Sequence, residues 1–362
     1  MRFSCLFVLL FVFPGIMCAQ EFDYHRYEGT IGDKRVVLHL HKNAFREYVN
    51  GENLNVVQYR GMFYNAAHDM PVAINGSPDE AGRLNLYEAR SSMQLVQTGT
   101  TLSGTWTDEG STKTYPVELR EAYPNGSVAF TGYSFYDRKP LFPQKNTSPG
   151  MQVNLCWLEP SGKMPEETRK FLREVIHREM MGTTQPCCPG PEKAFETIRD
   201  EQFRMYDEEF RETLQQDPEM PEHMMNFSDE QVVAVLYNDK HLLSLGFTHY
   251  FYSGGAHGNY ATTTRSYDLK KRKAIELSDV FSPGYEKPLE GALDRAARVY
   301  MELKPTDKLE NAYLVEKIPV TDNFYLTGKG IVFSYPPYEI AAYANGQIDL
   351  FIPFDQLGPW VK

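Results

Sequence analysis

The feature that most constrains this chain is a change in the spacing of its apolar residues near its middle. Residues 20–123 hold seven or eight short runs of alternating apolar and polar residues, each closed by Gly, Asn, Asp or Ser. In one such run, Val36, Leu38 and Leu40 share one face of a strand. Short consecutive strands bury such faces most simply as an up-and-down meander curled into a small barrel. We therefore predict an all-β domain, a meander or small barrel, over residues 20–123.

The second half of the chain alternates between strand and helix patterns. Residues 165–181 and 191–216 repeat apolar residues every three to five positions, which predicts two amphipathic helices. Strands follow, joined by a tight turn at Asn238–Asp239, and then another helix and a β-rich C-terminus. This order predicts an α+β domain over residues 151–362, in which helices pack on an antiparallel sheet.

Residues 124–150 separate these two regions. They contain four prolines and no sustained periodicity. Because proline interrupts both helices and sheet ladders, we interpret this segment as a linker with one short strand inside it.

The first nineteen residues are predicted to be a secretory signal peptide outside the fold. Arg2 precedes the unbroken apolar run 6–13, which is too short to be a good membrane span. Cys18 suggests a lipid anchor as the alternative, but Met17 stands where a small residue is expected before a modified cysteine. No later stretch is long and apolar enough to cross a bilayer. We expect an exported protein of the periplasm or the cell surface, without a transmembrane segment after signal cleavage.

The charge of the chain restricts its partners. The formal net charge is −11, and it becomes −12 once Arg2 is removed with the signal. An acidic protein repels nucleic acid backbones and anionic lipid, so nucleic acid is excluded as a partner. The same charge attracts a basic partner, although plain solubility is the favoured explanation of it.

Three cysteines remain after signal removal: Cys156, Cys187 and Cys188. Export permits a disulfide, in which Cys156 pairs with one of the adjacent two, and buried free thiols are the alternative. A zinc site is disfavoured because the adjacent pair lacks the usual C-x-x-C spacing. The sequence therefore predicts neither a metal nor a cofactor.

The stretch YFYSGGAHGNY, which contains His257, is predicted to connect two antiparallel strands. Gly254 and Gly258 are interpreted as structural turn residues, because glycine permits the positive φ that a bulged connection needs. A catalytic histidine would need a nucleophile and an orienting carboxylate, and Ser253 lacks the strand–turn–helix context of a nucleophile elbow. A structural role is favoured, with partner contact next.

The stretch SYPPYEIAAYANG poses a similar choice. Pro336 and Pro337 cannot donate ladder hydrogen bonds, so this segment should leave the sheet as a stiff loop. Its tyrosines, Tyr335, Tyr338 and Tyr343, either engage a partner at low entropic cost or fill a small core beneath the loop. The sequence leaves these two interpretations open.

Two features of the β domain are interpreted as structural. His39 and His41 fall on one strand face, and we expect surface histidines on a polar sheet face rather than a metal site. Trp106 is expected to plug the barrel rather than to form a sugar platform.

The two motifs, GGAHG and PYEIAAYANG, carry a resemblance to a known family. Together with the segments YDL…IELSDVF and GQIDLFIPF, they resemble the DUF3298 family. The preceding strand, two helices and hairpin resemble the DUF4163 region that usually travels with it, as in the extracellular parts of RsiV-like and PdaC-like bacterial envelope proteins. The resemblance covers roughly residues 130–357.

This resemblance implies a cell-envelope domain. In RsiV-like proteins the domain binds lysozyme, and in PdaC-like proteins it accompanies a separate polysaccharide deacetylase. This sequence shows neither a sigma-binding segment with a membrane anchor nor a deacetylase domain, so signalling and deacetylation are not carried over.

We therefore predict an exported, non-catalytic binding protein of the DUF3298 type. Its expected partner is an envelope protein, in the sharpest form a basic lysozyme-like protein, or an envelope glycan. The alternatives are an envelope glycan or peptide hydrolase that uses His257, and a passive two-domain scaffold. The predicted partner-binding residues are Tyr252, Ser253, Gly255, His257, Tyr335, Pro336, Tyr338 and Tyr343.

Overall fold

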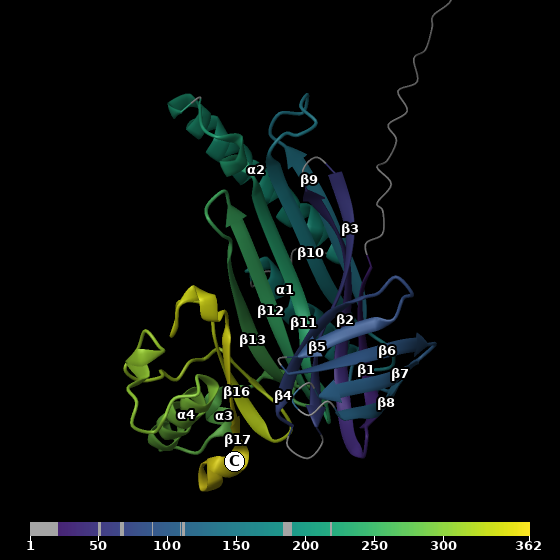
Figure 1. The fold of residues 1–362 in the computed structure, drawn as a ribbon, viewed down its shortest axis with the longest axis vertical. Coiled ribbons are helices and arrows are strands. Elements are labelled where there is room, and N and C mark those ends of the chain that lie inside the picture. The colour runs from purple at the N-terminus through teal and green to yellow at the C-terminus, as the bar shows by residue number, and fades with distance from the viewer. Residues whose placement is uncertain are drawn as a thin grey trace, which may run out of the picture.

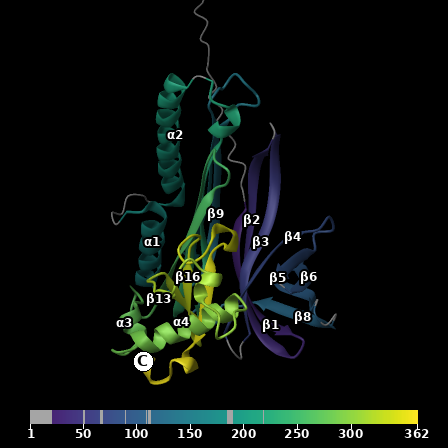
Figure 2. The same cartoon turned by 60° about the vertical axis from the view of Figure 1, so that its left-hand side comes forward.

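The computed structural model describes residues 21–49, 52–65, 69–88, 90–108, 110, 113–183, 190–217 and 219–362. It contains a closed eight-stranded barrel, a six-stranded sheet and a three-stranded sheet (Figure 1). Figure 2 shows helices α1 and α2 on one face of the six-stranded sheet and the barrel on the other. The predicted fold class, an all-β region followed by an α+β region, is confirmed.

The barrel is an up-and-down meander in which every strand pairs with its sequence neighbour and β1 pairs with β8 to close the ring. Val36, Leu38 and Leu40 are buried in its interior, as their alternation predicts. Trp106 is half-buried against the same core and donates to Ser91 Oγ over 2.8 Å. The strands are β1 (Phe22–Ile31), β2 (Lys34–Val49), β3 (Glu52–Asn65), β4 (Pro71–Pro78), β5 (Leu84–Glu88), β6 (Ser91–Thr98), β7 (Thr101–Asp108) and β8 (Lys113–Glu121).

The six-stranded sheet is mixed, whereas the sequence predicted an antiparallel one. Its order is β14-β13-β12-β11-β10-β9, and β10 runs parallel to β11 because helices α1 and α2 cross over between them. The elements are β9 (Ala129–Pro140), β10 (Gly150–Ser161), α1 (Glu166–Met181), α2 (Pro191–Gln216), β11 (Phe227–Asp239), β12 (Leu242–Ser253), β13 (Asn259–Asp268) and β14 (Lys273–Ala274).

Two local predictions need correction here. The segment 124–150 holds not a short strand but the twelve-residue β9, which pairs with β10 along its whole length. The tight turn lies at Lys240–His241, whose φ values of +50° and +69° suit a two-residue hairpin. Asn238 is instead buried in β11, where its side chain bonds the backbone N–H and C=O of Val128 at 2.9 and 2.7 Å.

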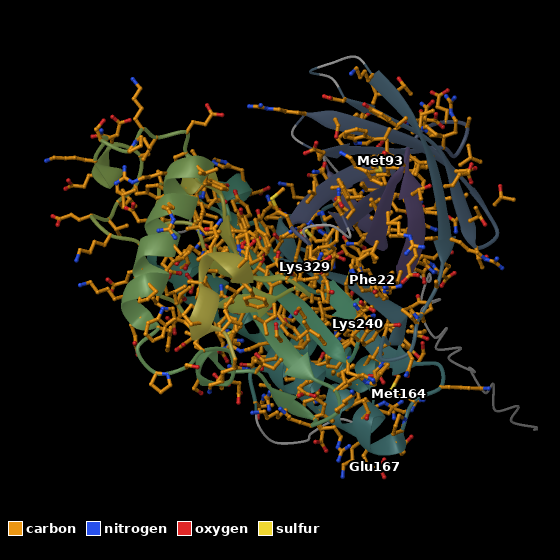
Figure 3. All side chains as sticks on the ribbon, turned by 90° about the horizontal axis from the view of Figure 1, so that it is seen from below. Phe22, Met93, Met164, Glu167, Lys240 and Lys329 are labelled. Atoms are coloured by element: carbon orange, nitrogen blue, oxygen red, sulfur yellow. The ribbon has the colours of Figure 1, made fainter. Side chains whose placement is uncertain are left out.

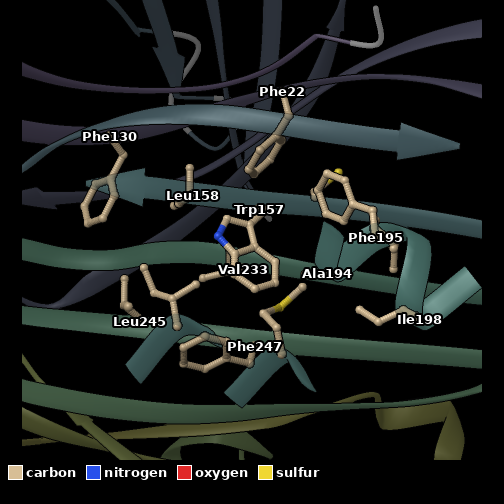
Figure 4. Packing of buried hydrophobic residues seen from close by; sticks show 14 of the residues in the cluster. Phe22, Phe130, Trp157, Leu158, Ala194, Phe195, Ile198, Val233, Leu245 and Phe247 are labelled. Atoms are coloured by element: carbon tan, nitrogen blue, oxygen red, sulfur yellow. The ribbon is translucent and has the colours of Figure 1, made fainter. Parts of the chain in front are cut away.

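The main core lies around β10 and joins the six-stranded sheet to the helices on one face and to the barrel on the other. Trp157 is buried, and its ring meets that of Phe195 on α2 edge-on at 6.0 Å. Phe22 of the barrel belongs to the same cluster, which Figure 4 shows with Val233 of β11. One side of β1 therefore shares a core with the sheet and the helices, while the barrel interior has a separate core.

The three-stranded sheet packs on the six-stranded sheet near the C-terminus. Ser244 Oγ donates to Leu326 O, and Leu326 N donates to Ser266 Oγ, both over 2.8 Å. The order is β15-β16-β17. This region comprises α3 (Leu277–Val280), α4 (Glu286–Tyr300), β15 (Phe324–Leu326), β16 (Gly330–Tyr335) and β17 (Ile348–Pro353). Short 3₁₀ turns occupy Glu222–Met225, Leu309–Asn311, Tyr343–Asn345, Phe354–Gln356 and Gly358–Trp360.

His39 and His41 are buried, so the prediction of surface histidines is wrong. Their side chains lie on the outer face of β2, and β11 covers that face. His39 Nδ1 lies 2.8 Å from Tyr24 Oη, and Val235 N donates to His41 Nε2 over 3.0 Å. The alternation of β2 was read correctly, but alternation cannot tell a solvated outer face from one that is covered by another sheet.

Candidate functional site

The two sequence motifs that lie far apart in the chain meet at one surface. The ring of His257 stacks on that of Tyr343, with centroids 4.2 Å apart and an interplanar angle of 23°. The ring of Tyr338 lies against the ring of Tyr343 in a tilted contact, with centroids 5.5 Å apart and an interplanar angle of 34°. We call His257, Tyr338 and Tyr343 the aromatic rim.

Hydrogen bonds to one backbone carbonyl hold two members of the rim together. Tyr343 Oη donates to Gly258 O over 2.6 Å, and His257 Nδ1 donates to the same oxygen over 2.8 Å. Tyr343 belongs to a 3₁₀ turn between β16 and β17, while Gly258 immediately precedes β13. The carbonyl therefore fixes the loop of one sheet against the loop of the other.

At two of the three glycines in the loop, the surrounding atoms or the backbone conformation require glycine. Gly254 has a φ of +76°, and a Cβ there would lie 1.8 Å from Met224 O. A Cβ on Gly258 would lie 2.3 Å from the Tyr250 ring. Around Gly255, by contrast, no atom would lie within 4 Å of an added Cβ.

This difference gives a matched pair of variants. Gly254→Ala is expected to lower the free energy of unfolding by about 1–3 kcal/mol, because alanine is strained at positive φ and meets a backbone oxygen. Gly255→Ala should change it by less than about 0.5 kcal/mol, since the added methyl enters open space. Thermal denaturation followed by circular dichroism compares the two, and equal midpoints would contradict the assigned role of Gly254.

Tyr338 is exposed, with 53% of its surface accessible. Its φ of +70° is rare for a residue other than glycine and is held by the bond from Tyr338 N to Ala341 O at 3.1 Å. Such strained conformations concentrate at functional sites. The neighbouring Glu339 is exposed, and partial burial of its carboxyl raises its pKa above the usual value.

Other predicted contact residues lie apart from the rim. Tyr335 is completely buried and its hydroxyl donates to Pro319 O over 2.7 Å, so its prediction as a partner-binding residue is wrong. Both faces of β16 are covered, which the strand pattern does not reveal. Tyr252 is half-buried and donates to Gly255 O over 3.0 Å, and Pro336 is half-buried at the start of the rim loop. Ser253 is exposed at the end of β12.

Cys156 is a buried free thiol, so the predicted disulfide from this residue is absent from the structure. Its Sγ donates to Asn43 Oδ1 over 3.5 Å on the barrel side of β10, and burial raises the pKa of the thiol to about 12. Cys187 and Cys188 themselves lie outside the described residues.

Sequence reasoning missed two polar groups near the rim. Gln347 fixes the rim loop to β13, because its side-chain oxygen accepts from Thr262 N over 2.8 Å and its amide donates to Thr262 O over 3.0 Å. His249 Nε2 lies 2.6 Å from a carboxylate oxygen of the fully buried Asp229, and this hydrogen bond raises the pKa of His249. The only signal in the sequence for the pair His249–Asp229 was that the two residues lie on adjacent strands. Using this signal requires knowledge of how the two strands are aligned.

Comparison with known proteins assigns the residues of the rim to two family matches. Residues 278–355 match the family described as "Protein of unknown function (DUF3298)". The predicted DUF3298 resemblance is confirmed. Residues 173–260 match a second family, described as "Deacetylase PdaC". His257 lies in the PdaC match, and Tyr338 and Tyr343 lie in the DUF3298 match, so the rim forms where the two matched regions meet.

A solved structure of the DUF3298 family shares the fold over about two thirds of this chain. A member from Bacteroides fragilis is 21% identical, covers 66% of this chain and 94% of its own, and superposes with a TM-score of 0.59. A member from Pseudomonas aeruginosa, also 21% identical, covers 64% of this chain and 94% of its own, with a TM-score of 0.45. No curated protein matches this chain. Among the described residues, no helix combines the length and the apolar character that a membrane span requires.

Proposed function

We propose that this protein is an exported binding protein of the cell envelope that recognises a partner through the aromatic rim and does not act as an enzyme. The observation that carries the proposal is the exposed ring of Tyr338, which is held at positive φ and lies tilted against Tyr343, which in turn stacks on His257. Rings fixed in this way lose little conformational entropy when they are covered, which favours recognition by contact.

The chemistry of the rim favours a basic protein as the partner. A lysine or arginine side chain binds the face of a tyrosine ring, and the exposed Glu339 supplies a carboxylate next to Tyr338. The formal net charge of −12 after signal removal would speed the capture of a basic protein. A lysozyme-like protein is the sharpest form of this proposal, because RsiV-like relatives use this domain to bind lysozyme. Deacetylation belongs to the name of the PdaC family and is not proposed for this chain.

The environment of His257 supports binding over hydrolysis. Its Nδ1 donates to a backbone carbonyl and one face of its ring is covered by Tyr343. A general base in a nucleophilic mechanism is instead oriented by a carboxylate and contacts a hydroxyl or thiol. Among the described residues, no contact of His257 favours the hydrolase alternative.

Calorimetry with a basic lysozyme tests the proposal. We expect binding that weakens between about 0.01 M and about 0.15 M ionic strength, because the attraction is partly electrostatic. Tyr338→Ala should weaken it by about 2 kcal/mol or more, which is the loss typical of a central aromatic contact. Tyr87→Ala is the matched control, since Tyr87 of the barrel is 50% exposed and lies outside the rim.

The outcomes separate the three hypotheses. If soluble peptidoglycan fragments bind in place of lysozyme, and Tyr338→Ala abolishes this binding, the rim is a glycan site. If neither probe binds, or if both variants bind equally well, recognition through the rim is wrong and the passive scaffold remains.

A further inference from the structure

A second surface, separate from the aromatic rim, lies along the outer edge of β17. The three-stranded sheet ends at this strand, and β16 is its only partner among the described residues. A groove of about 1080 Å³ runs along it, between α4 on one side and the segment around Lys329 on the other. Figure 3 labels Lys329, which lies between the C-terminal strands and the barrel.

The hydrogen-bond register shows which backbone groups face this groove. Phe354 N donates to Lys329 O, so alternate residues of β17, including Ile352 and Leu350, direct their backbone groups to β16. The backbone N–H and C=O groups of Asp349 and Phe351 therefore point to the open edge. No hydrogen bond from any described residue reaches these groups. An unpaired edge of this kind is a template for another strand.

The walls of the groove are apolar and exposed. On α4, Val299 is 79% exposed and Tyr300 is 45% exposed, and Met70 from the barrel side is 51% exposed. Large apolar side chains on a helix beside an open strand edge form pockets for alternate side chains of an added strand. Apolar residues exposed together in one groove mark an interaction site.

The charge in the groove defines the partner further. Arg295 of α4 lines the groove, is exposed and forms no ion pair with any described residue. The Asp349 carboxyl accepts a hydrogen bond from Ser334, and no ion pair joins it to Arg295 among the described residues. A carboxylate on the partner would complement Arg295 bidentately.

We propose that the groove between α4 and β17 binds an extended peptide segment of another protein. The segment pairs with the backbone of Asp349 and Phe351, places alternate apolar side chains against Val299 and Tyr300, and presents a carboxylate to Arg295. This is addition of a strand to a sheet edge beside a helix, and it is independent of the rim.

A library of short synthetic peptides, each with alternating apolar residues and one glutamate, provides the probe. The tightest peptide should lose at least about tenfold in affinity when its backbone is N-methylated at the pairing positions, because N-methylation removes the donors but keeps the side chains. Arg295→Gln and Val299→Asp should weaken it similarly. Val96→Asp is the control, since Val96 is an exposed valine of the barrel.

Amide hydrogen exchange measured by NMR gives an independent readout. In the free protein, the amides of Asp349 and Phe351 should exchange faster than those of Leu350 and Ile352, and the peptide should slow the first two. Equal binding of the N-methylated peptide, or failure of every library member to bind at about 1 mM, would overturn the proposal. A dimer that protects Phe351 at high concentration would also overturn it, since the occupant would then be a second copy of this chain.

Discussion

Replacing Arg26 with alanine is expected to lower the free energy of unfolding by about 3–5 kcal/mol. Arg26 lies on β1 of the barrel and is only 1% exposed. Its Nε donates to Asn238 O of β11 over 2.9 Å, and its Nη1 donates to Ala122 O over 2.9 Å and to Glu28 over 2.6 Å. Alanine would leave two carbonyls without their donor and would open a cavity between barrel and sheet.

Urea denaturation measures this difference, with Arg35→Ala as the matched control. Arg35 is an exposed arginine on the neighbouring strand β2, and its loss should change stability by less than about 0.5 kcal/mol. If the two variants unfold at the same urea concentration, the buried guanidinium contributes nothing net. A smaller slope for Arg26→Ala, with two transitions, would instead show that the barrel and the sheet unfold separately.

The elements themselves could be predicted from the sequence because they depend on local periodicity. The apolar spacing of residues 165–181 anticipated α1 almost to the residue, and the alternation around Leu38 anticipated the barrel interior. The parallel pairing of β10 with β11 could not be read in the same way, because it depends on where the chain re-enters the sheet after two helices. The strand pattern is the same for both pairings.

The candidate site was predictable as two motifs but not as one surface. Each motif signals a loop, through glycines around His257 and prolines before Tyr338. The contact between His257 and Tyr343 depends on how the three-stranded sheet docks on the six-stranded sheet, which neither motif encodes locally. Tyr335 was expected at a surface for a related reason, because its burial in the core between the three-stranded sheet and α4 depends on long-range packing.

Acidification is expected to destabilise the interface between barrel and sheet through its buried histidines. Burial lowers the pKa of His41 to about 4, and burial lowers the pKa of His39 well below its usual value. In the neutral ring, Nε2 of His41 accepts the bond from Val235 N, which a protonated nitrogen cannot do. Arg26 also lowers the pKa of His39. Both rings must therefore stay uncharged in the folded protein.

The direction of the effect follows from proton binding. His41 in the unfolded chain has a pKa near 6.5 and binds a proton at pH values where His41 in the folded protein stays neutral. The contribution of His41 to the free energy of unfolding is therefore complete above about pH 6.5. It is lost as the pH falls through about 4, and the total loss is about 3 kcal/mol.

The free energy of unfolding from urea titrations between these pH values should therefore fall more steeply in the native protein than in His41→Gln. Glutamine keeps an acceptor for Val235 N but does not titrate. His223→Gln, which removes an exposed histidine, should leave the slope unchanged. Equal slopes in the native protein and His41→Gln would show that His41 takes up its proton without disturbing the interface.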